Sequence, residues 1–223
     1  MAADLPRPAP EGGFNFTWDP SVAHLNMSMK DYLATNTTVE GTATGALVFS
    51  KSKLSSTTED DSEEKDRILL VQRAPADSMP LAWEVPGGGC DWGDETLLYS
   101  LARELWEESR LVLKHVVRQV GEPYVFFTRR GRRIAKLNFE ADVERPAGDG
   151  HVLPEVTLDP NEHVRFLWAT EDECRRHKVV VPGGDDNGEG EVVEIQFTTK
   201  GQLESILDGF QLRREVTNSK AAI

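Results

Sequence analysis

The chain has only two cysteines, Cys90 and Cys174, among 223 residues. Two cysteines cannot form the disulfide framework of a small secreted domain, and they are ordinary in a reducing compartment. Cys174 is followed by His177 three residues later, but no second pair of metal ligands accompanies them. A tetrahedral zinc site is therefore not predicted.

Long apolar runs are also missing. No stretch approaches the ~20 residues that a membrane-spanning helix requires. The first residues, MAADLPRPAPEGG, lack the basic segment and apolar run of a secretory signal. We therefore expect no membrane partner and a cytoplasmic location, with the nucleus as the alternative.

Positive charge is scarce, since 25 Lys and Arg residues face 38 Asp and Glu residues, for a formal net charge of −13. Nucleic-acid-binding proteins normally carry a basic surface, so we expect no nucleic-acid partner. An anionic substrate would need a metal ion or a local group of cations in order to bind. The apolar content of 39% is enough for a hydrophobic core.

The composition changes along the chain and predicts three parts. Residues 1–42 form an N-terminal extension whose start, rich in Pro, Ala and Gly, is expected to be flexible. Residues 43–178 form the main domain, and residues 179–223 add a C-terminal strand and helix packed on it. Residues 51–66, KSKLSSTTEDDSEEKD, predict a disordered acidic loop, with an acidic docking segment as the alternative.

Hydrophobic periodicity predicts both strands and helices in the main domain. Strands are expected at residues 43–50, 67–73, 112–120, 124–128, 134–142 and 161–168. Helices are expected at residues 28–34, 95–109 and 199–210, and after a capping box formed by Thr170 and Glu173. This mixture, with hairpins between strands, favours an α/β fold in which helices sandwich a sheet.

The most informative segment is a glycine turn followed by an acidic helix. Glu104, Glu107 and Glu108 are three or four positions apart, so they share one helix face. Their mutual repulsion would become ligation around Mg²⁺ or Mn²⁺, because these ions prefer oxygen ligands. The alternative is a solvated, glutamate-rich helix face.

The spacing of this segment resembles the Nudix box, Gly-x5-Glu-x7-Arg-Glu-U-x-Glu-Glu-x-Gly-U, where U is bulky and aliphatic. The matching residues are Gly89, Glu95 and the run from Arg103 to Leu111. Arg110 departs from the box, which has glycine there, and a left-handed conformation at Arg110 would cost about 1–2 kcal/mol. A second alignment starts at Gly88 and replaces Glu95 by Asp94 with one extra residue; the residue count favours Glu95.

The resemblance implies a Nudix-type α/β/α sandwich with a mixed β-sheet between helices. It implies that Glu107 and Glu108 are the main ligands of Mg²⁺ or Mn²⁺, and that Glu104 is a further ligand or the catalytic base. Arg103 and Glu95 would form an orienting ion pair.

The implied activity is hydrolysis of a pyrophosphate linkage in a nucleoside-diphosphate-linked compound by metal-assisted attack of water. The first alternative is a non-catalytic Nudix domain that binds a nucleotide or a protein. A relative of isopentenyl-diphosphate isomerase is disfavoured, because Cys90 lies in the glycine loop and the histidines are dispersed.

Several residues outside the helix are weaker candidates. Glu162 matches, loosely, a downstream glutamate that acts as the base in some Nudix hydrolases; the alternative is a surface glutamate. His163 beside it is interpreted as a surface histidine. Gly88 and Gly89 would let the backbone approach substrate phosphates, and Arg129, in a cluster of four arginines, would contact a distal phosphate unless it is simply solvated.

The sequence does not select a substrate. Trp83, Phe126, Phe127 and Trp168 could stack on a base, but aromatic residues in strands belong to the core more often. Phe127 stands where a proline, sixteen residues past the box, would indicate ADP-ribose. The substrate therefore stays a nucleotide-type compound of unspecified identity.

Overall fold

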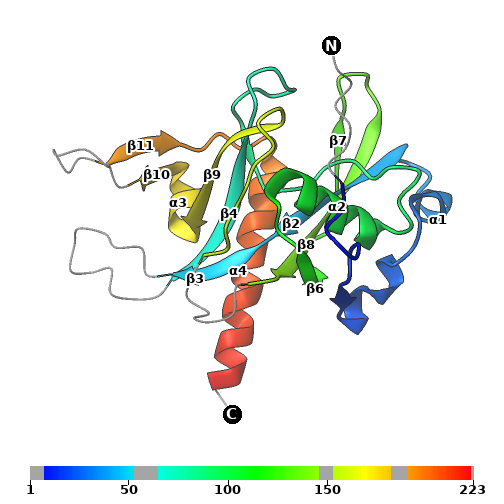
Figure 1. Cartoon of the computed structure of the whole chain (residues 1–223), viewed down its shortest axis with the longest axis horizontal. Helices are drawn as coiled ribbons and strands as arrows, with labels where there is room; N and C mark the ends of the chain where they lie inside the picture. The colour runs from blue at the N-terminus through cyan, green and yellow to red at the C-terminus, as the bar shows by residue number, and fades with distance from the viewer. Residues whose placement is uncertain (1–7, 53–64, 146–152, 182–189, 222–223) are drawn as a thin grey trace.

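The structure is a computed structural model that describes residues 8–52, 65–145, 153–181 and 190–221 (Figure 1). Its elements in chain order are β1 (Thr17–Trp18), η1 (Pro20–Leu25), α1 (Met29–Thr35), β2 (Gly41–Leu47), β3 (Phe49–Ser52), β4 (Lys65–Arg73), β5 (Trp83–Glu84), α2 (Leu97–Ser109), β6 (Leu113–Gln119), β7 (Tyr124–Phe127), β8 (Arg133–Val143), β9 (His163–Thr170), α3 (Glu171–Arg176), β10 (Lys178–Val181), β11 (Glu191–Glu194) and α4 (Lys200–Ala221).

The strands form two main sheets and a separate hairpin. The first sheet is mixed, with β1 parallel to β6, β2 parallel to β8, and both β6 and β7 antiparallel to β8. The second is antiparallel, with β3, β5 and β9 all paired to β4. The hairpin consists of β10 and β11. The predicted strand at residues 43–50 is divided at Val48, so that one apolar run serves both sheets.

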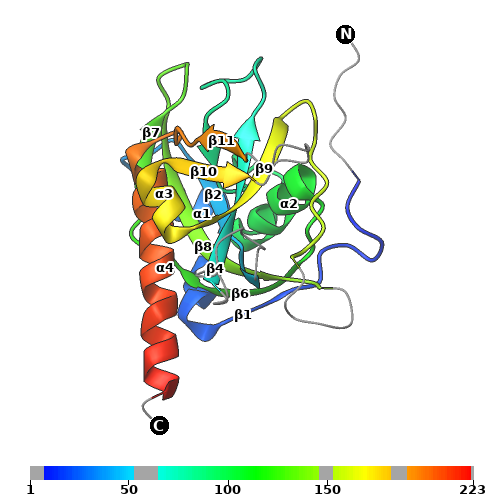
Figure 2. The same cartoon turned by 90° about the vertical axis from the view of Figure 1, so that its left-hand side faces the viewer.

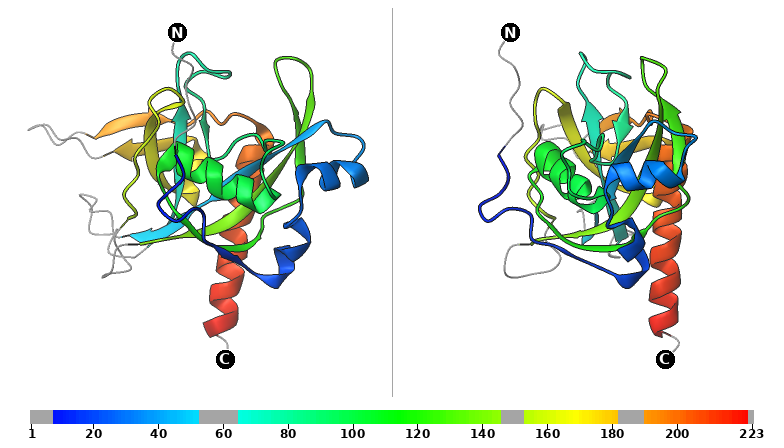
Figure 3. Two further views of the ribbon diagram at one scale, coloured as in Figure 1. Left: turned by 45° about the vertical axis from the view of Figure 1, so that its right-hand side comes forward. Right: turned by 90° about the vertical axis from the view of Figure 1, so that its right-hand side faces the viewer.

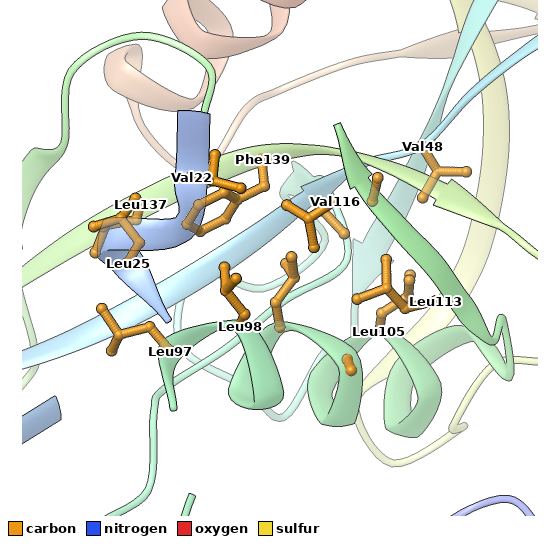
Figure 4. Close-up of a cluster of buried hydrophobic side chains, with 14 of the residues drawn as sticks. Val22, Leu25, Val48, Leu97, Leu98, Leu105, Leu113, Val116, Leu137 and Phe139 are labelled. Carbon is orange, nitrogen blue, oxygen red and sulfur yellow. The ribbon is translucent and has the colours of Figure 1, made fainter. Parts of the chain in front are cut away.

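The sheets lie between α2 on one side and α4 on the other, as the side views show (Figures 2 and 3). One core cluster joins the apolar stripe of α2 to the first sheet and includes Leu98, Leu105 and Phe139 (Figure 4). A second cluster joins Ile206 and Phe210 of α4 to β3 and β4. The predicted α/β fold, a mixed sheet between helices, is confirmed.

The α2 helix is capped at both ends. The Thr96 side chain accepts a hydrogen bond from the backbone N–H of Tyr99 at 3.0 Å, so the helix begins two residues later than predicted. At its end, Arg110 adopts the left-handed conformation, with φ of 59°. Its guanidinium lies 4.8 Å from the centre of the Trp106 ring, a favourable cation–π contact.

The ends of the described chain pack on this framework. The Trp106 indole N–H donates to the carbonyl of Pro8 at 3.0 Å, and Phe14 contacts Tyr99 edge to face, so residues 8–14 cross the outer face of α2. Helix α4 continues eleven residues past the predicted end at Phe210. Arg213 anchors this extension through Glu140 and Asp66, at 2.6 and 2.9 Å.

The two ends of the predicted acidic loop, 51–66, belong to strands. Residues 51–52 and 65–66 are paired strand residues in β3 and β4, because Ser52 lies opposite Lys65. Residues 53–64 lie outside the described residues. Among the described helices, none combines the length and the apolar character that crossing a membrane requires.

Candidate active site

Arg103 is the centre of a compact group of charges on α2. Its Nη1 donates to Glu104 and to Glu107, each at 2.8 Å. Its Nε and Nη2 donate to the two carboxylate oxygens of Asp94, each at 2.9 Å, and Nη2 also donates to the carbonyl of Gly89 at 3.0 Å. Burial alone would lower the pKa of Arg103, but the bonds to Asp94 and the neighbouring carboxylates raise it above its usual value.

The predicted pair of Arg103 with Glu95 is wrong, because the partner is Asp94. The Asp94 carboxylate also accepts the Ser100 hydroxyl at 2.6 Å, whereas Glu95 is exposed to solvent. Although burial opposes ionisation, the hydrogen bonds from Arg103 and Ser100 lower the pKa of Asp94. The glycine loop therefore follows the second alignment, with Asp94 and one extra residue before the helix.

Glu104 lies directly below the glycine turn. A Cβ added at Gly88 would lie 2.4 Å from the Glu104 Oε2 atom, so only glycine fits there without movement. Burial raises the pKa of Glu104 to about 7, helped by the negative charges of Glu107 and Glu162 and opposed by Arg103. A carboxyl group with this pKa can hold or release a proton near neutral pH.

Glu108 is more deeply buried than its neighbours, with 5% of the residue exposed. Its Oε2 accepts the backbone N–H of Gly87 at 2.6 Å. Gly87 has φ of +143°, and a Cβ there would lie 2.2 Å from the Thr44 carbonyl oxygen, so the turn requires glycine. Burial and the charges of Glu104 and Glu84 raise the pKa of Glu108 well above its ordinary value.

A second group of charges lies beside Glu108 and comes from four strands. Glu84 on β5, 5% exposed, bonds to Arg73 on β4 and lies 3.7 Å from the Nζ of Lys136 on β8. Burial alone would raise the pKa of Glu84, but the charge of Lys136, the neighbouring His163 and the charge of Arg73 bring it down to about 2. Although burial disfavours its charge, Glu84 also raises the pKa of Lys136. None of these residues has a spacing that the sequence analysis could recognise.

Glu162 and His163 complete this group from the start of β9. The ligand atoms of Glu108, Glu162 and His163 lie within 4.8 Å of one another. Burial and nearby carboxylates raise the pKa of Glu162, whose backbone carbonyl accepts the N–H of Ala74 at 2.7 Å. The interpretation of His163 as a surface histidine is wrong, because only 2% of the residue is exposed.

The three predicted metal ligands lie close together but have different partners. Glu108 faces Glu162 and His163, whereas Glu104 and Glu107 both accept hydrogen bonds from Arg103. Glu162 is exposed to solvent, as the alternative of a surface glutamate held, and one of its carboxylate oxygens lies within 4.8 Å of a ligand atom of Glu108.

The other candidates lie further out. Arg129, at the exposed turn between β7 and β8, donates through Nη2 to the carbonyl of Asp77 at 2.9 Å. Trp83 and Trp168 are buried in the core, as the alternative interpretation held, while 68% of Phe127 is exposed.

Comparison with known proteins gives a family. A family model described as NUDIX domain matches residues 60–216. Among solved structures, the MutT protein from Methanosarcina mazei Go1 is 18% identical, with 78% of this chain and 94% of that chain covered and a TM-score of 0.47. The NUDIX domain of Shewanella oneidensis NrtR, complexed with ADP ribose, is 17% identical, with 83% and 98% covered and a TM-score of 0.46.

A C. elegans Ap4A hydrolase binary complex is 20% identical, with 61% of this chain and 85% of that chain covered and a TM-score of 0.43. No curated protein matches the chain. The family model covers well over half of the sequence, including all of the acidic residues of the site. The chain belongs to the NUDIX domain family.

Proposed function

We propose that the protein is a metal-dependent hydrolase that cleaves the pyrophosphate linkage of a nucleoside-diphosphate-linked compound. The observation that carries this proposal is the gathering of Glu104, Glu107 and Glu108 on one face of α2, two of them with raised pKa values. A protein that gained only stability from this helix would not favour such repulsion. A bound divalent cation would relieve the repulsion among these carboxylates.

The residues present fit Mg²⁺ or Mn²⁺. Glu108 has one hydrogen bond, from Gly87, and its charge interacts with that of Lys136, yet burial and the nearby carboxylates still raise its pKa, so the protein compensates its charge only in part. A bound divalent ion would neutralise phosphoryl oxygens and lower the pKa of a water molecule. Glu108 would hold the ion, with Glu104 and Glu107 beside it.

The protein residues would divide the remaining tasks. Glu104 would take a proton from the attacking water, because its carboxylate lies close to Glu108, the proposed metal ligand. Glu162 is the second candidate for this base. Arg103 would position Glu104 and Glu107 through the hydrogen bonds described above, without contacting the substrate.

The substrate would reach this site beside the glycine turn. A Cβ at Gly88 would meet the Glu104 carboxylate, whereas one at Gly89 would meet nothing within 4 Å. The open backbone of this turn would permit close approach of phosphate oxygens. Arg129 would contact a distal phosphate from the β7–β8 turn. The roles of the glycine turn and of Arg129 are inferred from their positions. A panel of nucleoside-diphosphate compounds would identify the substrate.

The test is a hydrolysis assay with MgCl₂ or MnCl₂ and a panel of nucleoside-diphosphate derivatives. We expect turnover that Glu108→Gln lowers at least ~100-fold in kcat, the loss typical when a key electrostatic contact to the transition state is removed. Glu95→Gln is the matched control, because Glu95 is exposed, and it should retain full activity. Tight nucleotide binding without turnover by the wild type would indicate the non-catalytic alternative instead.

A further inference from the structure

His163 is a buried imidazole that lies beside Glu84 but has no hydrogen bond of ordinary length among the described residues. Only 2% of the residue is exposed, and neither Nδ1 nor Nε2 has a hydrogen-bond partner among the described residues. Nε2 lies 3.9 Å from Glu84 Oε1, too far for a direct hydrogen bond. Leaving a buried polar atom without a partner costs about 1–3 kcal/mol, so the ring is expected to have another partner.

A β-bulge turns this ring toward α2. Arg165 lies opposite Gln72 and His163 lies opposite Arg73, so Val164 is an extra residue in β9. Without the bulge, His163 would share a face with Arg165, because side chains alternate along a strand. With it, His163 joins Arg73 on the face of β4 that also carries Leu69, which packs with α2. Bulges often re-aim a side chain in this way beside active sites.

The re-aimed ring meets two carboxylates from different elements. One ligand atom each from His163, Glu162 and Glu108 lies within 4.8 Å of the other two. Three ligands spaced evenly around one ion, each ~2.1 Å from it, are ~3.6 Å apart. The distances between the three ligand atoms would therefore have to shorten by up to about 1.2 Å for them to share one cation.

We propose that His163 supplies a nitrogen ligand to the metal ion, with Glu108 and Glu162 as oxygen ligands, so that the site prefers Mn²⁺ to Mg²⁺. The proposal rests on the metal-dependent function proposed above and adds a ligand from β9 to the helix carboxylates. Imidazole favours transition metals, whereas Mg²⁺ prefers oxygen ligands. Glu84 would orient the ring once the 3.9 Å between its Oε1 and His163 Nε2 closes to hydrogen-bond distance.

The test is pulsed electron paramagnetic resonance of Mn²⁺ bound to the intact protein without substrate. The wild type should show a ¹⁴N coupling from a directly bound imidazole, and this signal should change to a ¹⁵N coupling when the histidines are ¹⁵N-labelled. This comparison needs no substitution, so it cannot fail through misfolding. Bound Mn²⁺ without nitrogen coupling would overturn the proposal.

Two variants assign the nitrogen to a residue. His163→Gln should abolish the coupling and weaken Mn²⁺ binding by about tenfold or more, while Mg²⁺ binding changes less than about threefold. His24→Gln, at an exposed position, is the control and should leave coupling and affinity unchanged. A coupling that persists in His163→Gln contradicts the assignment.

Failure of this proposal is distinguishable from failure of the proposed function. If Mn²⁺ binds through oxygen ligands alone and hydrolysis still depends on Glu108, His163 is not a metal ligand. The proposed hydrolase function would then stand. The absence of any Mn²⁺ or Mg²⁺ binding by calorimetry would overturn both.

Discussion

Two groups of buried charge meet at Glu108, and they are built in different ways. The group around Arg103 is local: Asp94, Glu104 and Glu107 all lie within nine residues of it along the chain. The group around Glu84 joins residues of β4, β5, β8 and β9. The first can be recognised as a spacing in the sequence, whereas the second exists only after the sheets have formed.

The largest expected effect is on the free energy of unfolding, when the group around Glu84 is disrupted. Glu84→Gln leaves the buried Lys136 without its counter-charge and the half-buried Arg73 with Asp77 alone, so the free energy of unfolding should fall by about 3–5 kcal/mol. Urea denaturation monitored by circular dichroism measures this. Adding Lys136→Met to Glu84→Gln should recover part of the loss. If the loss of stability in the double variant equals the sum of the losses in the two single variants, the charges of Glu84 and Lys136 are not coupled.

The local group can be tested at its two neighbouring carboxylates. Asp94→Asn removes the charged acceptor of Arg103 and should cost about 1–3 kcal/mol of stability, together with a fall in kcat as Glu104 and Glu107 lose their alignment. Glu95→Gln, at an exposed site, should change stability by less than about 0.5 kcal/mol. The reverse ranking would restore the first alignment of the loop.

The raised pKa of Glu104 predicts a pH dependence without added metal. Burial raises the folded-state pKa from 4.5 to about 7, so the folded protein retains a proton that the unfolded chain releases in this interval. The resulting stability is complete below about pH 4.5 and is lost as the pH rises through 7. In EDTA, the wild type should lose up to about 1.4 kcal/mol per pH unit more than Glu104→Gln does. Parallel curves for the two proteins would refute the shift.

Arg110 should give the smallest effect. Arg110→Gly relieves a left-handed conformation worth about 1–2 kcal/mol but removes the cation–π contact with Trp106, worth about 0.5–1 kcal/mol. We expect a net rise in Tm of a few degrees at most. Arg110→Ala loses the contact and keeps the strain, so its Tm should fall below that of the wild type. A lower Tm for Arg110→Gly would mean that the contact outweighs the strain.

The sequence predicted features that depend on short-range spacing. The apolar stripe and the carboxylates of α2 follow from helical periodicity, and the Thr170 capping box is present as expected. The choice between Asp94 and Glu95 could not be made in this way, because a loop can absorb one extra residue before the cap at Thr96.

Other features depend on long-range contacts that a linear pattern does not contain. The orientation of His163 comes from a bulge that is visible only in the pairing of β9 with β4. The extension of α4 past Phe210 carries no apolar periodicity and is held by Arg213 through residues far away in the chain. Likewise, the division of residues 43–50 between two sheets arises because each half has a different partner strand.

The glycine turn is hydrogen-bonded to β2, a strand that precedes the residues matched by the family model. The backbone of β2 pairs with the turn on one edge, through Thr44 N–H to the Gly88 carbonyl at 2.9 Å and Ala46 N–H to the Pro86 carbonyl at 2.8 Å. Its other edge pairs with β8. A protein shortened to residues 60–216 would lack β2 and its hydrogen bonds to the turn. The turn would then be less well held in the position where Gly87 donates to Glu108. The folded domain therefore begins upstream of residues 60–216, and a shortened protein made for expression should include β2.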